Sequence, residues 1–180
     1  MIAVLLADGF EEIEAIAFVD ILRRAQIEVE TVSISDQIVV TGAHNIPVVA
    51  NITLDRLDIR DLEAVVLPGG GEGTERLKQS EAVSALLHSM QEENKLIGAI
   101  CAAPSVLGGL GLLNGKTATC YPGFEVALIG ATVANTPVVQ DGNIITSRGA
   151  GTAHEFAFAF VGRLKGTSLA NEIRAAMQYE

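Results

Sequence analysis

Cys101 is the residue of this sequence whose type and surroundings point most directly to covalent chemistry. It stands between two apolar runs in the stretch LIGAICAAPSVL, residues 96–107. The neighbours that permit a sharp turn are small, and they are Gly98, Ala99, Ala102 and Ala103. Pro104 fits the first turn of a helix, where the helix dipole lowers the pKa of a thiol. We therefore predict a nucleophile held at a strand-to-helix turn; the alternative is a buried structural cysteine.

Glu14 is the second candidate, because it stands at the head of an apolar helical stripe. The pattern predicts a helix from about Glu11 to Ala25. Steps of three and four from Glu14 reach apolar residues, namely Ala17, Phe18, Ile21, Leu22 and Ala25. A carboxyl group buried against a sheet tends to keep its proton, which it can donate or transfer. The alternative is a partly exposed residue of the first turn with its tip in water.

The two acids before Glu14 have a simpler explanation. Glu12 shares its helical face with Asp20 and Arg23, which is the pattern of a solvated surface. Acidic residues in a first turn are stabilised by the helix dipole. We therefore assign Glu11 and Glu12 no functional role at this point.

A glycine-rich segment, LPGGGEG at residues 67–73, is the third feature. Glycines allow close approach of the backbone to a ligand, and their N–H groups can face a developing oxyanion. The alternative is a plain turn. The segment lacks the Gly-Lys-Ser/Thr ending of a phosphate-binding loop, and the first predicted strand is followed by DGFEE instead of a dinucleotide fingerprint. Nucleotide binding is therefore not predicted.

Short apolar runs alternate with helical patterns along the chain. Strands are predicted at 2–7, 29–34, 64–68 and 96–100, and hairpins within 38–51 and 137–147. Further helices are predicted at 80–94, from about 104, at 153–164 and at 168–178. This alternation favours an α/β fold with a mostly parallel sheet covered by helices on both faces. The three candidate features all follow strands, so the topology places them at one edge of the sheet.

Composition narrows the functional classes. The 180 residues suit one domain, 1–180, with an aliphatic core, since 49% of the residues are hydrophobic and 4% aromatic. The net charge of −10 argues against a nucleic-acid or anionic membrane surface. Two cysteines do not make a disulfide framework, and they stand too far apart for a metal motif. The N-terminus lacks the pattern of a signal peptide, so we expect a cytoplasmic protein. We also expect that the protein uses no metal and no cofactor.

Four motifs in order, ADGFEEIE, VVLPGG, AICAAP and TSRGAGTAHEFA, resemble the ThiJ/PfpI family, and most closely its parkinsonism-associated deglycase branch. The resemblance implies a flavodoxin-like three-layer sandwich, similar to class I glutamine amidotransferases, and a homodimer. It implies that Cys101 is the nucleophile and Glu14 the protonated acid beside it. It also implies an oxyanion site made by the backbone N–H groups of Gly70 and Ala102. Members of the branch are described as glyoxalases, deglycases, oxidative-stress sensors and chaperones.

The sequence departs from the family pattern at two places. Ala102 stands where protease-like members carry a histidine after the nucleophile, so a Cys-His peptidase is disfavoured. The branch often has a histidine before a proline near the site, and here that position holds Tyr121, or Cys120 if the alignment slips by one residue. Either side chain is a candidate substrate contact. The three histidines are predicted in a loop (His44), on a helix surface (His88) and at a helix start (His154).

The leading hypothesis is a cofactor-free, cysteine-dependent enzyme of the glyoxalase or deglycase type, acting on small reactive carbonyls or their adducts. A redox-sensing or chaperone-like stress protein, in which Cys101 is oxidised, is the alternative from another class. An amide hydrolase is a third hypothesis. Both leading hypotheses depend on Cys101 and Glu14, so the sequence alone does not separate them.

Overall fold

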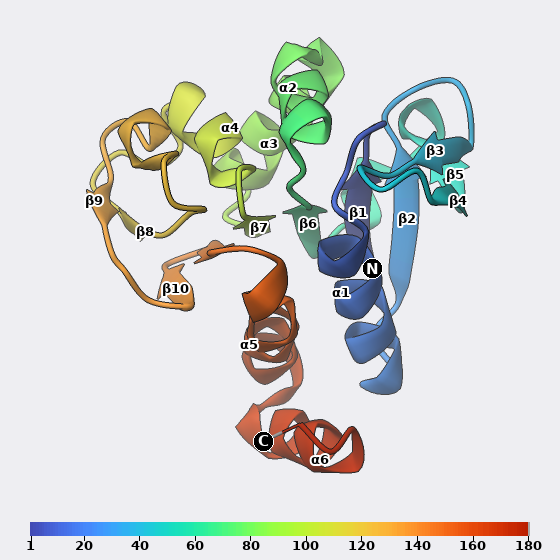
Figure 1. The fold of residues 1–180 in the computed structure, drawn as a ribbon, viewed down its shortest axis with the longest axis vertical. Helices are drawn as coiled ribbons and strands as arrows, with labels where there is room; N and C mark the ends of the chain where they lie inside the picture. The colour runs from blue at the N-terminus through green and yellow to red at the C-terminus, as the bar shows by residue number, and fades with distance from the viewer. Residues whose placement is uncertain (180) are drawn as a thin grey trace.

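A central sheet of seven strands organises the fold (Figure 1). The computed structural model describes residues 1–179. The strand order is β10-β11-β7-β6-β1-β2-β5, and each neighbouring pair is parallel except β10 with β11. The strands are β1 (Ile2–Leu6), β2 (Val29–Ser33), β5 (Ile52–Thr53), β6 (Ala64–Leu67), β7 (Leu96–Ile100), β10 (Val138–Asp141) and β11 (Ile144–Ser147). The predicted mostly parallel sheet is confirmed.

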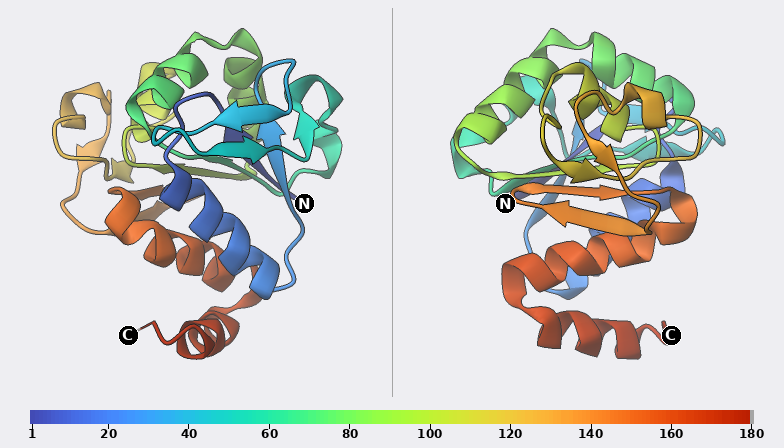
Figure 2. Two further views of the ribbon diagram at one scale, coloured as in Figure 1. Left: turned by 45° about the vertical axis from the view of Figure 1, so that its right-hand side comes forward. Right: turned by 90° about the vertical axis from the view of Figure 1, so that its left-hand side faces the viewer.

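Helices cover both faces of this sheet (Figure 2). They are α1 (Glu12–Arg24), α2 (Gly71–Gln79), α3 (Glu81–Glu92), α4 (Pro104–Gly109), α5 (Ala153–Lys165) and α6 (Thr167–Ala176). Helices α1 and α5 pack on one face and α3 and α4 on the other, while α6 lies against the outer side of α5. Single 3₁₀ turns occur at Leu54–Arg56, Ile59–Asp61, Glu125–Ala127 and Ala150–Thr152.

Two small ladders stand apart from the main sheet. Strands β3 (Val39–Thr41) and β4 (Pro47–Val49) form the predicted antiparallel hairpin, which projects beside β2 in Figure 1. Strands β8 (Thr117–Ala118) and β9 (Thr132–Val133) pair in parallel. The sequence did not predict this second ladder, because strands of two residues carry no periodicity.

Helix α2 was also missed. Its sequence begins GEGT, and glycine is among the poorest helix formers, so the segment looks like a turn. The chain enters this helix through Gly70, whose φ of 89° lies in the left-handed region that glycine tolerates. One side of the helix is then buried through Gly73, Thr74 and Leu77, so tertiary packing outweighs local propensity here.

The interior fixes α1 relative to the strand ends. All five residues of β1 are buried, as expected for a strand covered on both faces. Phe18 of α1 packs against Phe156 and Phe160 of α5, with ring centroids 5.4 and 5.0 Å away. This contact orients α1 so that its first turn lies at the carboxyl edge of the sheet. No helix in residues 1–179 is long and apolar enough to cross a membrane.

Candidate active site at the carboxyl edge of the sheet

Cys101 occupies a strained turn immediately after β7. Its φ of 64° is a left-handed conformation that is unfavourable for a residue with a side chain. Two backbone hydrogen bonds hold the turn, from Cys101 N to the Ser147 carbonyl (2.9 Å) and from Tyr121 N to the Cys101 carbonyl (2.8 Å). Pro104 begins α4 as predicted. The turn therefore lifts the thiol out of the sheet, where it is partly exposed.

Glu14 lies beside this thiol and is buried, with 1% of its surface exposed. Its Oε2 accepts a hydrogen bond from Gly69 N at 2.7 Å, and its backbone N–H donates to the Glu11 side chain at 2.8 Å. Its Oε1 is buried and has no hydrogen-bond partner among the described residues. The prediction that Glu14 heads a buried stripe is confirmed, and the partly exposed alternative is wrong.

Gly69 allows the acid and the thiol to approach one another. A Cβ atom at this position would lie 2.6 Å from the Cys101 Cβ and 2.7 Å from the Glu14 Oε2, so no side chain fits. The glycine-rich segment after β6 therefore does more than turn the chain. It brings a backbone N–H to the carboxyl group and leaves room for two reactive side chains.

The site perturbs the pKa values of both groups. Burial raises the pKa of Glu14 to about 7, although the Gly69 N–H and the neighbouring thiol act in the opposite direction. Burial, followed by the charge of Glu14, raises the pKa of Cys101 to about 12. Hydrogen bonds from the backbone N–H groups of Gly70 and Ala102 to the thiol oppose this rise.

The expectation of a lowered pKa for Cys101 is therefore wrong, because the net shift is upward, although the backbone N–H of Ala102 before the helix does act downward. Helix α4 has only six residues, so its dipole is small. Burial and a neighbouring carboxylate both disfavour the thiolate, and together they outweigh the backbone N–H groups. The titrations of Cys101 and Glu14 are coupled, because the charge of Glu14 raises the pKa of Cys101.

The loop after β11 and the segment after β8 complete the surroundings of the thiol. A Cβ atom on Gly149 would lie 3.2 Å from the Tyr121 ring and 4.0 Å from the Cys101 sulfur, so the ring and the sulfur share this corner. The Tyr121 side chain is half exposed. Cys120, in contrast, is buried in the core on the α3 side of the sheet, and burial raises its pKa to about 11. Of the two candidate contacts, the structure places Tyr121 at the site and Cys120 away from it.

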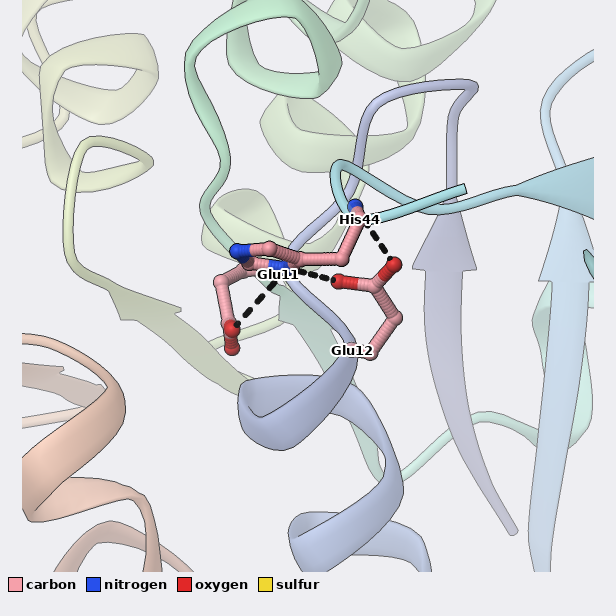
Figure 3. A group of neighbouring side chains, drawn as sticks. All are labelled: Glu11, Glu12 and His44. Atoms are coloured by element: carbon pink, nitrogen blue, oxygen red, sulfur yellow. Dashed lines mark hydrogen bonds and ion pairs between the residues drawn. The ribbon is translucent and has the colours of Figure 1, made fainter. Parts of the chain in front are cut away.

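All three histidines lie where the sequence indicates. His88 is exposed on α3, and His154 opens α5, where its ring stacks on Tyr179 at a centroid distance of 5.1 Å. His44 lies in the hairpin loop as predicted, but it makes an unforeseen contact with Glu12. Figure 3 shows His44, Glu12 and Glu11 together, with the His44 Nδ1 at 2.7 Å from Glu12 Oε2.

This contact overturns the interpretation of Glu12 as a solvated residue. Only 6% of its surface is exposed, because the hairpin loop folds over the first turn of α1. Glu11, Glu12 and His44 also bring three possible metal-ligand atoms within 4.8 Å of one another, which spacing along the sequence could not reveal. The imidazole and the Glu12 carboxylate are already hydrogen-bonded to each other, and this bond accounts for their proximity.

The comparisons with known proteins identify the same family over most of the chain. The DJ-1/PfpI family model matches residues 1–163. Protein DJ-1 homolog B of Arabidopsis thaliana is 40% identical over 173 residues, which cover 93% of this chain and 40% of that protein. This chain spans less than half the length of the Arabidopsis relatives, since it covers 45% of the DJ-1 homolog A of the same plant.

Shorter relatives match over nearly their full length. A Pyrococcus horikoshii protein named a deglycase is 32% identical over 163 residues, 89% of this chain and 97% of that protein. The crystal structure of DJ-1beta from Drosophila melanogaster superimposes with a TM-score of 0.93 and 37% identity, covering 99% of this chain and 97% of that chain. The fold is thus flavodoxin-like, of the class I glutamine amidotransferase type, and the chain belongs to the DJ-1/PfpI family.

Proposed function

We propose that this protein is a cysteine-dependent enzyme of the glyoxalase or deglycase type, acting on small reactive carbonyl compounds or their adducts. The observation that carries the proposal is the contact between Cys101 and a buried carboxyl group with a pKa of about 7. A group with this pKa exchanges protons readily near neutral pH, as a general acid–base catalyst must. The deglycase name of the archaeal relatives supports the same class of chemistry.

The first step is addition of the thiol to the aldehyde carbon of a dicarbonyl such as methylglyoxal. A carbon–sulfur bond forms, the carbonyl π electrons move to oxygen, and the thiol proton reaches that oxygen through Glu14. We assign the stabilisation of the new oxyanion to the backbone N–H groups of Gly70 and Ala102, and their hydrogen bonds to the Cys101 thiol support this assignment. The product is a hemithioacetal on Cys101.

The second step consists of two proton transfers through an enediol. The Glu14 carboxylate removes the proton from the carbon bound to sulfur and delivers it to the oxygen of the adjacent carbonyl group, which gives the enediol. Glu14 then removes the hydroxyl proton on the carbon bound to sulfur and delivers it to the adjacent carbon, so that the first oxygen becomes a carbonyl oxygen. The hemithioacetal becomes a thioester of a hydroxyacid, with no net oxidation. Water then cleaves the thioester, which releases the hydroxyacid and restores the thiol.

The test compares two cysteine variants in one assay. Purified wild type, Cys101→Ser and Cys120→Ser are incubated with methylglyoxal, and the lactate formed is measured over time. We expect wild type and Cys120→Ser to form lactate at similar rates and Cys101→Ser to form none above the buffer rate. Lactate formation by Cys101→Ser at the wild-type rate contradicts the proposal.

A redox sensor is the second candidate, and one observation favours it. The buried Glu14 side chain interacts with the Cys101 thiol, and its Oε1 has no hydrogen-bond partner among the described residues. When protonated, this carboxyl group can donate a hydrogen bond to an oxidised sulfur. Both cysteines are free, which suits a reducing compartment such as the cytoplasm. An amide hydrolase has less support, because Ala102 supplies no imidazole next to the nucleophile.

We also propose that the chain forms a homodimer. Helix α1 and the β3–β4 hairpin both expose large apolar side chains. These two elements lie next to each other, because Glu12 of α1 is hydrogen-bonded to His44 of the hairpin loop. The exposed apolar side chains are Ile13, Ile16, Val39, Ile46 and Val49. Exposed apolar groups on neighbouring elements are typical of a protein interface.

A further inference from the structure

We propose that Glu12 and His44 form a clamp that positions Glu14, by tying the hairpin loop to the first turn of α1. The inference rests on the proposed function, because it assigns Glu12 and His44 the task of holding the acid against Cys101. Both are positioning residues, since they contact each other and the backbone around them, and His44 also lies 4.0 Å from the Glu11 carboxylate.

The clamp consists of two short hydrogen bonds to one buried carboxylate (Figure 3). Glu12 Oε1 accepts from the His44 backbone N–H at 2.7 Å, and Glu12 Oε2 lies 2.7 Å from the His44 Nδ1. Burial raises the pKa of Glu12, but the side-chain and backbone hydrogen bonds from His44 outweigh it, and the net direction is downward. Glu12 is thus a charged, fully satisfied carboxylate, although it is buried.

The hairpin loop is built to reach this carboxylate. Gly42 packs directly on the Glu12 side chain, and a Cβ atom at Gly42 would overlap it. The backbone adds further ties, from Ala43 N to the Phe10 carbonyl (2.8 Å) and from Gly9 N to the Thr41 carbonyl (2.7 Å). The loop is therefore fixed to the segment that leads into α1.

The opposite side of the same helical turn holds Glu14. Glu11 N donates to the Gly69 carbonyl at 3.0 Å, and Gly69 N donates to the Glu14 carboxyl group at 2.7 Å. Residues two apart on a helix point in nearly opposite directions, so Glu12 faces the hairpin while Glu14 faces the thiol. The turn is held between the hairpin loop and the Gly69 segment, and releasing one side allows it to move.

Movement of this turn has two consequences for Glu14. Displacement of a reacting group by about 1 Å lowers the rate of an oriented reaction by up to about 100-fold. A loosened first turn also admits water to the carboxyl group, and its pKa then falls from about 7 toward the ordinary 4.5. The titratable groups that act on Glu14 are Cys101, in the turn after β7, and Glu11, the N-cap residue of α1.

The test uses Glu12→Ala, which removes both hydrogen bonds, and Glu12→Gln, which retains them. A glutamine accepts from the His44 N–H and donates to a neutral imidazole, so it preserves the clamp. Glu81→Ala is the matched control, because Glu81 is an exposed acid in the first turn of α3. Two quantities are measured for each protein: kcat and KM for methylglyoxal, and the pH dependence of Cys101 alkylation by iodoacetamide.

We expect Glu12→Ala to lower kcat by about tenfold, with KM nearly unchanged. The inflection that Glu14 gives to the alkylation profile near pH 7 should move to lower pH in this variant. Glu12→Gln and Glu81→Ala should resemble wild type in both measurements. A role of Glu12 in stability alone would change the unfolding temperature and leave the inflection and kcat where they are, and that result overturns the proposal.

The alkylation profile separates this proposal from the proposed function. If wild type does not turn over methylglyoxal, the enzyme proposal fails, while the profile still reports whether the clamp holds Glu14. If Glu12→Ala does not fold, His44→Ala replaces it, because it removes only the side-chain bond and keeps the backbone one. If His44→Ala folds and its alkylation profile has the same inflection as that of wild type, the result contradicts the clamp.

Discussion

Replacing Glu14 by glutamine should make the protein more stable, and the gain should depend on pH. The pKa of Glu14 rises from 4.5 to about 7 on folding, mainly because the group is buried. Between these two values the folded protein binds more protons than the unfolded chain, so stability falls as the pH rises through this window. Glutamine has the same shape and does not ionise, so the free energy of unfolding of the variant does not fall in this pH window.

The size of the effect follows from the same pKa values. A rise from 4.5 to about 7 corresponds to about 3 kcal/mol, at about 1.36 kcal/mol for each pH unit. The wild type should therefore lose about 3 kcal/mol relative to Glu14→Gln between about pH 4 and about pH 8. Near pH 4, both side chains are neutral, and only a small constant difference should remain.

Urea unfolding of both proteins at several pH values measures this difference directly. Glu81→Gln is the control, because Glu81 is exposed and its neutralisation should give a difference that changes little with pH. A difference between wild type and Glu14→Gln that stays constant from about pH 4 to about pH 8 would refute the reasoning, since it would mean that Glu14 ionises as an ordinary carboxyl group.

Three further predictions concern the thiols, the glycine segment and the assembly. Cys101 should react with iodoacetamide faster than the buried Cys120, and equal labelling of the two in mass spectrometry would contradict the site described above. Gly69→Ala should lower carbonyl turnover at least about tenfold, because its methyl group must displace the Cys101 Cβ or the Glu14 carboxyl group; wild-type kinetics would exclude this contact. Light scattering should give a mass twice 18.9 kDa for the wild type, and Ile16→Glu should shift it to the monomer; a monomeric wild type rejects the dimer.

The parts of the fold that the sequence predicts are those governed by local periodicity. The strand at residues 96–100 is found with the predicted bounds, and α1 begins within one residue of its expected start. The helical phase also places Glu14 on the buried face, because the stripe from Ala17 to Ala25 is continuous. Parallel strands meet at one edge, and this geometry brings the residues after β1, β6 and β7 together.

The parts that the sequence does not predict depend on contacts between distant segments. The bond between Glu12 and His44 joins residues 32 positions apart, and nothing in the local pattern of either residue indicates it. The pKa of Cys101 depends on the sum of burial, a neighbouring carboxyl group and two N–H groups, and only the structure shows which effect is larger. The choice between Tyr121 and Cys120 likewise depends on which side chain of an irregular segment turns toward the thiol.

The central claim is that Glu14 transfers a proton for the chemistry of Cys101. The most direct test is the pH dependence of kcat for methylglyoxal, measured side by side for wild type and Glu14→Gln. We predict that wild type shows an inflection near pH 7, and that Glu14→Gln loses both the inflection and at least about 100-fold in kcat. Turnover that survives intact in Glu14→Gln, with the same inflection, would contradict the claim and remove Glu14 from the mechanism.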